Sequence, residues 1–181
     1  MTAPKSRRPR ALTGEEQALL LFHVAPEVRT VTLYVLALRF GLGARALSAL
    51  NIGDVSEDGR TPRELLRFGS TTLPLFPQPL GAEVRRTLAR YLAWRCSCFH
   101  LRHPLRTYRD SAGVERCHSC HDDVRTAWNP LFIGRRRRRL SAKRMQNEFA
   151  EHRRELGFDA CLRFNSLRLA ALEALWAGEA P

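Results

Sequence analysis

Four of the five cysteines fall in one short stretch and form two closely spaced pairs. Cys96 and Cys98 make the first pair, and Cys117 and Cys120 follow after eighteen intervening residues. Two such pairs can place four thiolates on one tetrahedral ion, while the intervening loop closes the site. Zn²⁺ suits four thiolates because it is borderline soft and imposes no d-electron geometry. The pattern therefore predicts a closed, structural zinc site with these four ligands.

Two alternatives to a four-cysteine site stay open. His100, His118 and His121 lie close enough in the sequence to replace one cysteine, which would give a Cys₃His set. The other alternative is four unliganded thiols in a loop. Cys161 stands alone among apolar neighbours, and we interpret it as a core thiol.

Arginine dominates the remaining chemistry. Lysine and arginine number 30 against 18 aspartates and glutamates, which leaves a net charge of +12 and points to a polyanionic partner. Residues 135–139 are five consecutive arginines, whose mutual repulsion is relieved when an anion binds. Lys143 and Arg144 oppose the dipole of a helix predicted to open at Ser141, and they fit where phosphates approach.

A solvated loop is the alternative interpretation of this charge run. Phosphate contacts would give affinity and salt dependence without sequence readout. The predicted DNA contacts in this region are Arg135, Arg136, Arg137, Arg138, Arg139, Lys143 and Arg144.

The elements that position these groups are mostly helices. With 181 residues, of which 44% are hydrophobic, the chain can bury the core of about one domain. Thr13 and Glu16 form a capping box that opens the first helix. Glycines at positions 41 and 43 end the second. We expect helices at 13–24, 26–40, 44–50, 80–95, 141–156 and 165–177.

A small β element interrupts the helices. Apolar residues between 63 and 75 are split by a Gly-Ser-Thr-Thr stretch, which predicts a small antiparallel hairpin or meander. The fold class is thus mainly α with a small antiparallel β element. We assign 1–11 to a flexible basic arm and 12–181 to one domain, interrupted at 96–127 by a compact, zinc-ribbon-like insert.

The sequence carries no membrane signal. No apolar run reaches the ~18 residues of a membrane helix. The first ten residues are basic without the apolar core of a signal peptide. We therefore expect a cytoplasmic protein with no membrane partner.

Three segments together carry a family resemblance. Residues 36–55 form a helix-breaker-helix block, residues 130–135 lead with Leu-Phe into the Ser141 helix, and residues 165–169 form an Asn-Ser-Leu-Arg-Leu box. In order and spacing they resemble the catalytic domain of tyrosine recombinases, the phage integrase family. The resemblance covers about 12–178 apart from the insert. It implies that fold and a surface that lies on DNA.

The resemblance also implies which groups catalysis would need, and most have no match. That family uses two arginines and a tyrosine that forms a covalent phosphotyrosine. The first arginine falls on Gly43, and Arg45 matches only after a two-residue shift. Asn165 and Leu169 replace two histidines of the family's box.

The hairpin lysine of the family has no counterpart in residues 68–72. The last tyrosine, Tyr108, lies in the insert, and the sequence ends at Pro181 before a nucleophile helix. Only Arg168 matches. It either contacts phosphate or packs its stem over the helix that carries it.

These observations predict a non-catalytic protein that binds DNA, with duplex favoured, on a recombinase-like scaffold. It would act as an accessory or regulatory factor of a mobile element or of a larger DNA-associated assembly. The alternative is a protein-interaction subunit, whose zinc insert and C-terminal helix hold a partner or a second copy of the chain.

Overall fold

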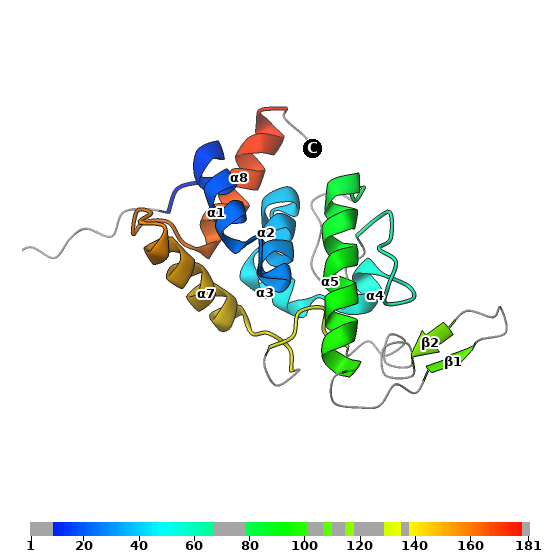
Figure 1. The fold of residues 1–181 in the computed structure, drawn as a ribbon. Helices are drawn as coiled ribbons and strands as arrows, with labels where there is room; N and C mark the ends of the chain where they lie inside the picture. Colours follow the sequence, from blue (N-terminus) through cyan, green and yellow to red (C-terminus); the bar gives the residue numbers. More distant parts are fainter. Residues whose placement is uncertain are drawn as a thin grey trace, which may run out of the picture. The chain divides into compact units, whose positions relative to one another are not determined.

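The computed structural model describes residues 9–66, 79–100, 107–109, 115–117, 129–134 and 138–178. For residues 96, 98–100, 107–109 and 115–117 we describe the backbone alone. The chain divides into two compact units, Met1–Ser48 with Leu140–Pro181 and Ala49–Arg139. The helices are α1 (Gly14–Val24), α2 (Val28–Phe40), α3 (Ala44–Ala49), α4 (Ile52–Val55), α5 (Ala82–His100), α7 (Ala142–Glu155) and α8 (Phe164–Trp176), and the strands are β1 (Thr107–Arg109) and β2 (Glu115–Cys117) (Figure 1).

The first unit joins both ends of the chain around α2. Helix α2 packs against α8 and α1, and α7 packs against α8 and α1 (Figure 1). Seven consecutive residues of α2, from Thr32 to Leu38, are buried, as its nearly continuous apolar sequence predicts. The facing helices add Leu20, Phe149 and Leu167, each at most 1% exposed. This unit is therefore an all-helical core built on α2.

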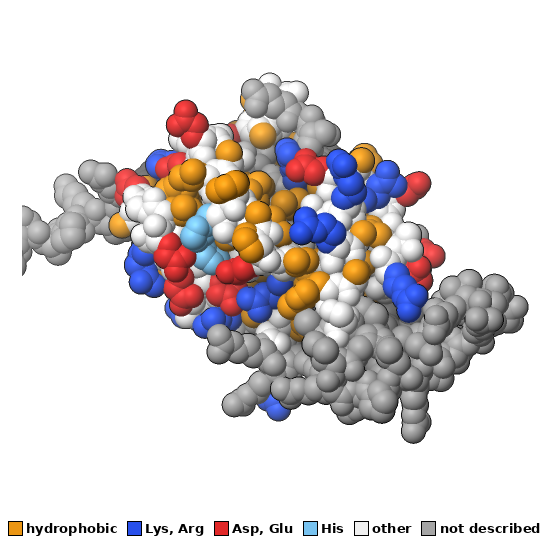
Figure 2. All heavy atoms as spheres, viewed as in Figure 1, with side chains coloured by type: hydrophobic (Ala, Val, Ile, Leu, Met, Phe, Trp, Pro, Cys, Tyr) orange, Lys and Arg blue, Asp and Glu red, His pale blue; other side chains and the backbone are white. Residues whose placement is uncertain are grey.

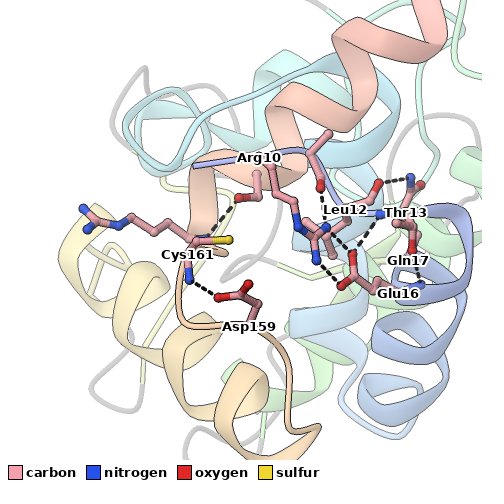
Figure 3. A network of polar contacts seen from close by, with 10 residues as sticks. Arg10, Leu12, Thr13, Glu16, Gln17, Asp159 and Cys161 are labelled. Atoms are coloured by element: carbon pink, nitrogen blue, oxygen red, sulfur yellow. Dashed lines mark hydrogen bonds and ion pairs between the residues drawn. The ribbon is translucent and has the colours of Figure 1, made fainter. Parts of the chain in front are cut away.

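Helix α1 starts at the predicted capping box. The Thr13 hydroxyl accepts from the Glu16 N–H at 3.2 Å, and the Glu16 carboxylate accepts from the Thr13 N–H at 2.9 Å. Arg10 adds two donors to that carboxylate, at 2.6 and 2.7 Å (Figure 3). The Arg10 hydrogen bonds lower the pKa of Glu16. Arg10, which the sequence assigns to an arm, is thus hydrogen-bonded to the first turn of α1.

Helix α2 ends where the glycine breaker predicts. Gly41 is left-handed, with a φ of 62°, a conformation that costs any other residue free energy. A Cβ at this position would lie 3.8 Å from that of Ala171 and 3.9 Å from Cγ of Arg168. The turn at Gly41 therefore lies directly against α8.

The second unit is organised by α5. Its predicted apolar stripe is confirmed, because Leu80, Val84, Leu88 and Leu92 are at most 5% exposed. The expected end near Arg95 is wrong, since the helix continues to His100 and takes in the start of the predicted insert. Helical periodicity in the sequence fades after Arg95, but three short polar or thiol-bearing residues do not break a helix that is already nucleated.

The expected hairpin at 63–75 lies mostly outside the described residues. Its base is visible, because Leu65 and Pro79 form an antiparallel bridge and the Leu80 N–H donates to the Glu64 carbonyl at 2.7 Å. Within the described residues, the two-stranded antiparallel sheet lies instead in the insert, where Tyr108 pairs with Arg116. None of the helices that the structure describes is long and apolar enough to cross a membrane.

Candidate nucleic-acid interface

The first turn of α7 carries two predicted DNA contacts. Ser141 caps the helix by accepting from the Arg144 N–H at 3.2 Å, as predicted for a helix that opens there. The first turn holds Lys143 and Arg144 but no acidic residue, so its charge opposes the helix dipole. Lys143 is exposed and has no ion-pair partner among the described residues. An anion at this helix end would satisfy both the free N–H groups and the cations.

Arg144 forms an ion pair with an acidic residue, Glu148, that was not predicted from the sequence. Its Nε donates to Oε1 of Glu148 at 2.9 Å, and Nη2 of Arg29 donates to the same oxygen at 2.9 Å. The Glu148 side chain is only 10% exposed, whereas that of Arg144 is 52% exposed. The sequence feature that could have revealed this ion pair is the four-residue spacing of Arg144 and Glu148, which places both residues on one helix face.

The residues on either side of the arginine run are held in place. Leu131, Phe132 and Ile133 are buried just before it, and Leu140 is buried just after it. Ile133 and Arg139 form an antiparallel bridge, and the Gly134 N–H donates to the Arg138 carbonyl at 2.9 Å. Arg135, Arg136 and Arg137 lie outside the described residues.

Two arginines of the predicted interface differ in their contacts. Arg139 donates to the Leu50 carbonyl at 3.1 Å and to Oδ1 of Asn51 at 2.6 Å, so its guanidinium fastens the loop to the α3–α4 segment. Arg138 is exposed. Of the two arginines of the run that the structure describes, Arg139 is therefore the one whose side chain is hydrogen-bonded to Leu50 and Asn51.

Helix α5 holds the segment that precedes the arginine run. The Tyr91 hydroxyl donates to the Leu131 carbonyl at 2.8 Å, and Arg95, 3% exposed, donates to the Pro130 carbonyl at 3.0 Å and to the Asn129 side chain. Buried donors that satisfy loop carbonyls fix the backbone before the arginines. These contacts of Tyr91 and Arg95 were not predicted from the sequence, because acceptors 34–40 residues away leave no local pattern.

Arg168 lies on the exposed side of α8, beside the α2–α3 turn. Its Cγ is the atom that a Cβ at Gly41 would meet, so its stem rests near this turn while the residue stays exposed. Arg45 is exposed on α3, and Asn165 is exposed at the start of α8. The residues that resemble the family's catalytic block and box are thus positioned by α2, α3 and α8 of one unit.

A second polar cluster joins α1, α2 and α7, and the sequence analysis missed it. The Tyr34 hydroxyl lies 2.8 Å from Nδ1 of His152, and Nε2 of His152 lies 3.9 Å from Oε1 of Glu27. His23 bonds Glu155 at 3.0 Å and meets the His152 ring edge-on at 5.6 Å. Figure 2 shows the imidazoles among acidic side chains on this face.

Burial makes Tyr34 a poor nucleophile. The residue is 1% exposed, and desolvation together with the nearby charge of Glu148 raises the pKa of its phenol. Tyr91 is fully buried, with its hydroxyl bound to the Leu131 carbonyl. Neither of these two tyrosines, the ones whose side chains the structure describes, presents a hydroxyl to solvent.

The predicted zinc ligands fall largely outside the described part. Cys120, His118 and His121 lie outside it, and Cys117 is placed only as the last residue of β2. Among the residues that the structure does describe, no cluster of three metal-binding side chains occurs. Cys161 is buried and free, as predicted for a core thiol.

The helical backbone of α5 bears on the first cysteine pair. Residues 96, 98 and 100 all lie in this helix. At ~100° per residue, positions 96 and 100 share one helix face, whereas position 98 lies about 200° around the axis from 96. Whether Cys98 or His100 completes a zinc site with Cys96 stays a prediction.

Comparison with known proteins places the fold. No protein-family model and no curated protein matches the chain. Among solved structures it is similar to XerA recombinase, with a TM-score of 0.63 and 16% identity over 99% of this chain and 54% of that one. It is also similar to the Tn1549 transposon integrase in complex with transposon right end DNA, with a TM-score of 0.61 and 14% identity over 97% of this chain and 56% of the integrase.

A third match is the same integrase in complex with circular intermediate DNA, with a TM-score of 0.59 and 14% identity. The chain therefore has a recombinase- or integrase-like fold and spans a little over half the length of these neighbours, 54–57%. The fold expected from the three sequence segments is confirmed. At this level of identity the likeness concerns the fold alone.

Proposed function

We propose that this chain binds duplex DNA through its phosphates and does not cut it. The observation that carries the proposal is the first turn of α7, where Lys143 and Arg144 oppose the helix dipole a few residues after the five arginines of the sequence. Such an arrangement is costly without an anion and becomes favourable with one. Phosphates along a duplex supply that anion at regular spacing.

The similar structures support DNA as the anion. Both integrase structures described above are complexes with DNA, and this chain shares their fold over 97–99% of its length. Phosphate contacts of this kind position a protein without reading sequence. The role we propose is that of an accessory or regulatory factor of a mobile element, or of a larger DNA-associated assembly.

Three substitutions and two buried hydroxyls support binding without cleavage. Gly43 stands where the resembled family has its first arginine, and Asn165 and Leu169 stand where its box has histidines. Phosphoryl transfer depends on such donors to stabilise developing charge. The hydroxyls of Tyr34 and Tyr91 are engaged inside the fold.

Fluorescence anisotropy against duplex DNA across a salt series tests the proposal. The variant to compare replaces Arg135, Arg136 and Arg137 by serine and keeps Arg139, which holds the loop through Leu50 and Asn51. The matched control removes the same charge from α5 by replacing its exposed arginines, Arg85, Arg86 and Arg90, with serine.

We expect the wild-type affinity to fall steeply with salt. If all three loop arginines contact phosphates, the slope of log K against log salt should flatten by about 2.7 in the loop variant, at ~0.9 per contact. The α5 control should keep most of the slope. Equal losses in the two variants would mean that only net charge matters, and wild-type binding no tighter than to single strands would contradict the duplex assignment.

Incubation with supercoiled plasmid tests the absence of cleavage. A non-catalytic protein leaves the plasmid supercoiled and forms no covalent adduct. Relaxation, or a protein–DNA adduct that survives denaturant, would overturn this part of the proposal.

A protein-interaction subunit is the second candidate, favoured by exposed apolar side chains. Phe22 is 81% exposed on α1 and Trp176 is 84% exposed at the end of α8. Large apolar residues left in water are typical of contact surfaces when they gather in a patch. Sedimentation of the wild type and of a Trp176→Ser variant tests self-association. A monomer at every concentration would exclude a second copy as the partner.

A structural zinc in the insert accompanies either function. The donor set of two thiol pairs and nearby imidazoles fits Zn²⁺, which would be held by Cys96, Cys117 and Cys120 with either Cys98 or His100. When bound, such an ion crosslinks the end of α5 to β2 and the residues after it. It has no part in the phosphate contacts proposed above.

A further inference from the structure

We propose that Glu148 is a positioning residue that holds Arg144 in the orientation needed to take one phosphate of the duplex. This inference rests on the proposed DNA binding and specifies which atoms make one of its contacts. The observation that carries it is the pair of arginines, Arg144 and Arg29, that converge on a single carboxylate oxygen of Glu148.

The contact leaves the outer end of the guanidinium available. Glu148 takes Nε of Arg144, and no described residue bonds to Nη1 or Nη2. Those two nitrogens can donate side by side to two oxygens of one phosphate, the geometry in which arginine binds phosphate best. Because Nε is fixed, less side-chain entropy is lost when the phosphate binds.

Glu148 is itself anchored, so it can serve as a fixed point. Its side chain is 10% exposed, and Arg29 of α2, 21% exposed, bonds the same Oε1 at 2.9 Å. Two cations share this one buried carboxylate, so it does not neutralise both of them. The anchoring thus keeps Glu148 from cancelling the charge of Arg144 outright.

Helix stability does not account for this pair. An ion pair within a helix stabilises best when the acid precedes the base, and here Arg144 precedes Glu148. Arg144 in the first turn also opposes the dipole. A pair placed against both preferences is explained if its purpose is to orient the guanidinium.

The test compares Glu148→Ala with a control of equal charge on the same helix, Glu151→Ala. Glu151 is exposed and has no ion-pair partner among the described residues. Removing either acid raises the net charge by one, so general electrostatics predicts tighter DNA binding for both variants. Positioning predicts the opposite for Glu148→Ala alone.

We expect Glu148→Ala to lose one phosphate contact. The slope of log K against log salt should flatten by about 0.9, which corresponds to roughly eightfold weaker binding to duplex DNA at 0.1 M salt. Glu148→Gln keeps an acceptor for Nε, so it should fall between this variant and the wild type. If Glu148→Ala fails to fold, Glu148→Gln can be used instead, because the glutamine still offers Arg29 an acceptor.

A double-variant cycle separates positioning from a structural role. In an Arg144→Ala background, Glu148→Ala should no longer weaken binding, because the group that it orients is gone. A loss of the same size in both backgrounds, or unchanged or tighter binding by both Glu148 variants, would overturn the inference. A wild type that does not bind duplex DNA would instead overturn the proposed function, and the two failures are distinguishable.

Discussion

The buried bond between Tyr34 and His152 offers a direct test of how α2 and α7 are joined. The tyrosine is 1% exposed and the histidine 8%, and the atoms that they share are 2.8 Å apart. Nε2 of His152 faces Glu27, which favours a proton there and leaves Nδ1 to accept from the hydroxyl. Replacing Tyr34 by phenylalanine removes this donor and leaves a buried acceptor unsatisfied.

The structure sets the size of the effect. The phenylalanine ring keeps the edge-to-face contacts that Tyr34 makes with Phe149 and Phe164, with centroids 5.9 and 6.2 Å away, so little packing is lost. The cost is then that of one unpaired buried polar atom, about 1–3 kcal/mol. For a chain of this length it should lower the Tm by about 2–12 °C.

Thermal and urea unfolding followed by circular dichroism measure the change. His152→Leu should also destabilise, because it leaves the Tyr34 hydroxyl unpaired. The double variant should be more stable than the sum of the two losses predicts, since replacing both partners by apolar groups removes the unpaired atoms. A Tyr34→Phe variant as stable as the wild type, or losses that add to within about 0.3 kcal/mol, would refute the reasoning.

Three further predictions concern a glycine, a carboxylate and the metal. Gly41→Ala should lower the free energy of unfolding by about 1–2 kcal/mol in chemical denaturation, because Gly41 has a φ of 62°. Gly43→Ala is the control, since a Cβ there would meet open space, and it should not lower the free energy of unfolding. Equal losses in the two variants would contradict the strain argument. Partial burial alone would raise the pKa of Asp58, but hydrogen bonds from the backbone of Thr61 and Arg60 and from two hydroxyls lower it to about 2. The ionised Asp58 carboxylate therefore adds to the free energy of unfolding above pH ~4, and this contribution is lost as the pH falls toward 2. After discounting for exposure, it is about 1 kcal/mol. An Asp58→Asn variant whose stability depends on pH as that of the wild type does would disprove it. Elemental analysis should find one zinc per chain. If α5 stays helical to its end, the His100→Ala variant should lose the zinc and the Cys98→Ser variant should keep it. The reverse pattern would favour the four-cysteine site.

Local patterns in the sequence predicted the helices well. The capping box of α1, the glycine stop of α2, the apolar stripe of α5 and the serine cap of α7 each depend on residues within a turn or two of each other. For the same reason the end of α5 that the sequence predicts lies five residues too early, because the helix persists beyond its periodic signal.

The contacts that position the candidate interface were less predictable. The residues that hold the loop and Arg144, namely Arg139 on Asn51, Tyr91 on Leu131 and Arg29 on Glu148, pair partners 40 to 119 residues apart. A sequence read alone shows that arginines are abundant, but not which of them are already bound. That distinction depends on tertiary packing, which brings distant partners together.

The first unit is built from two distant parts of the chain, and this affects its synthesis on the ribosome. Helix α2 is covered by α8, whose first residue follows the last buried residue of α2 by about 126 positions. At translation rates of roughly 5–20 residues per second, α8 is synthesised about 6–25 s after the apolar residues of α2. The nascent chain must keep that face from aggregating during the delay, which makes α2 the segment where chaperone capture is expected.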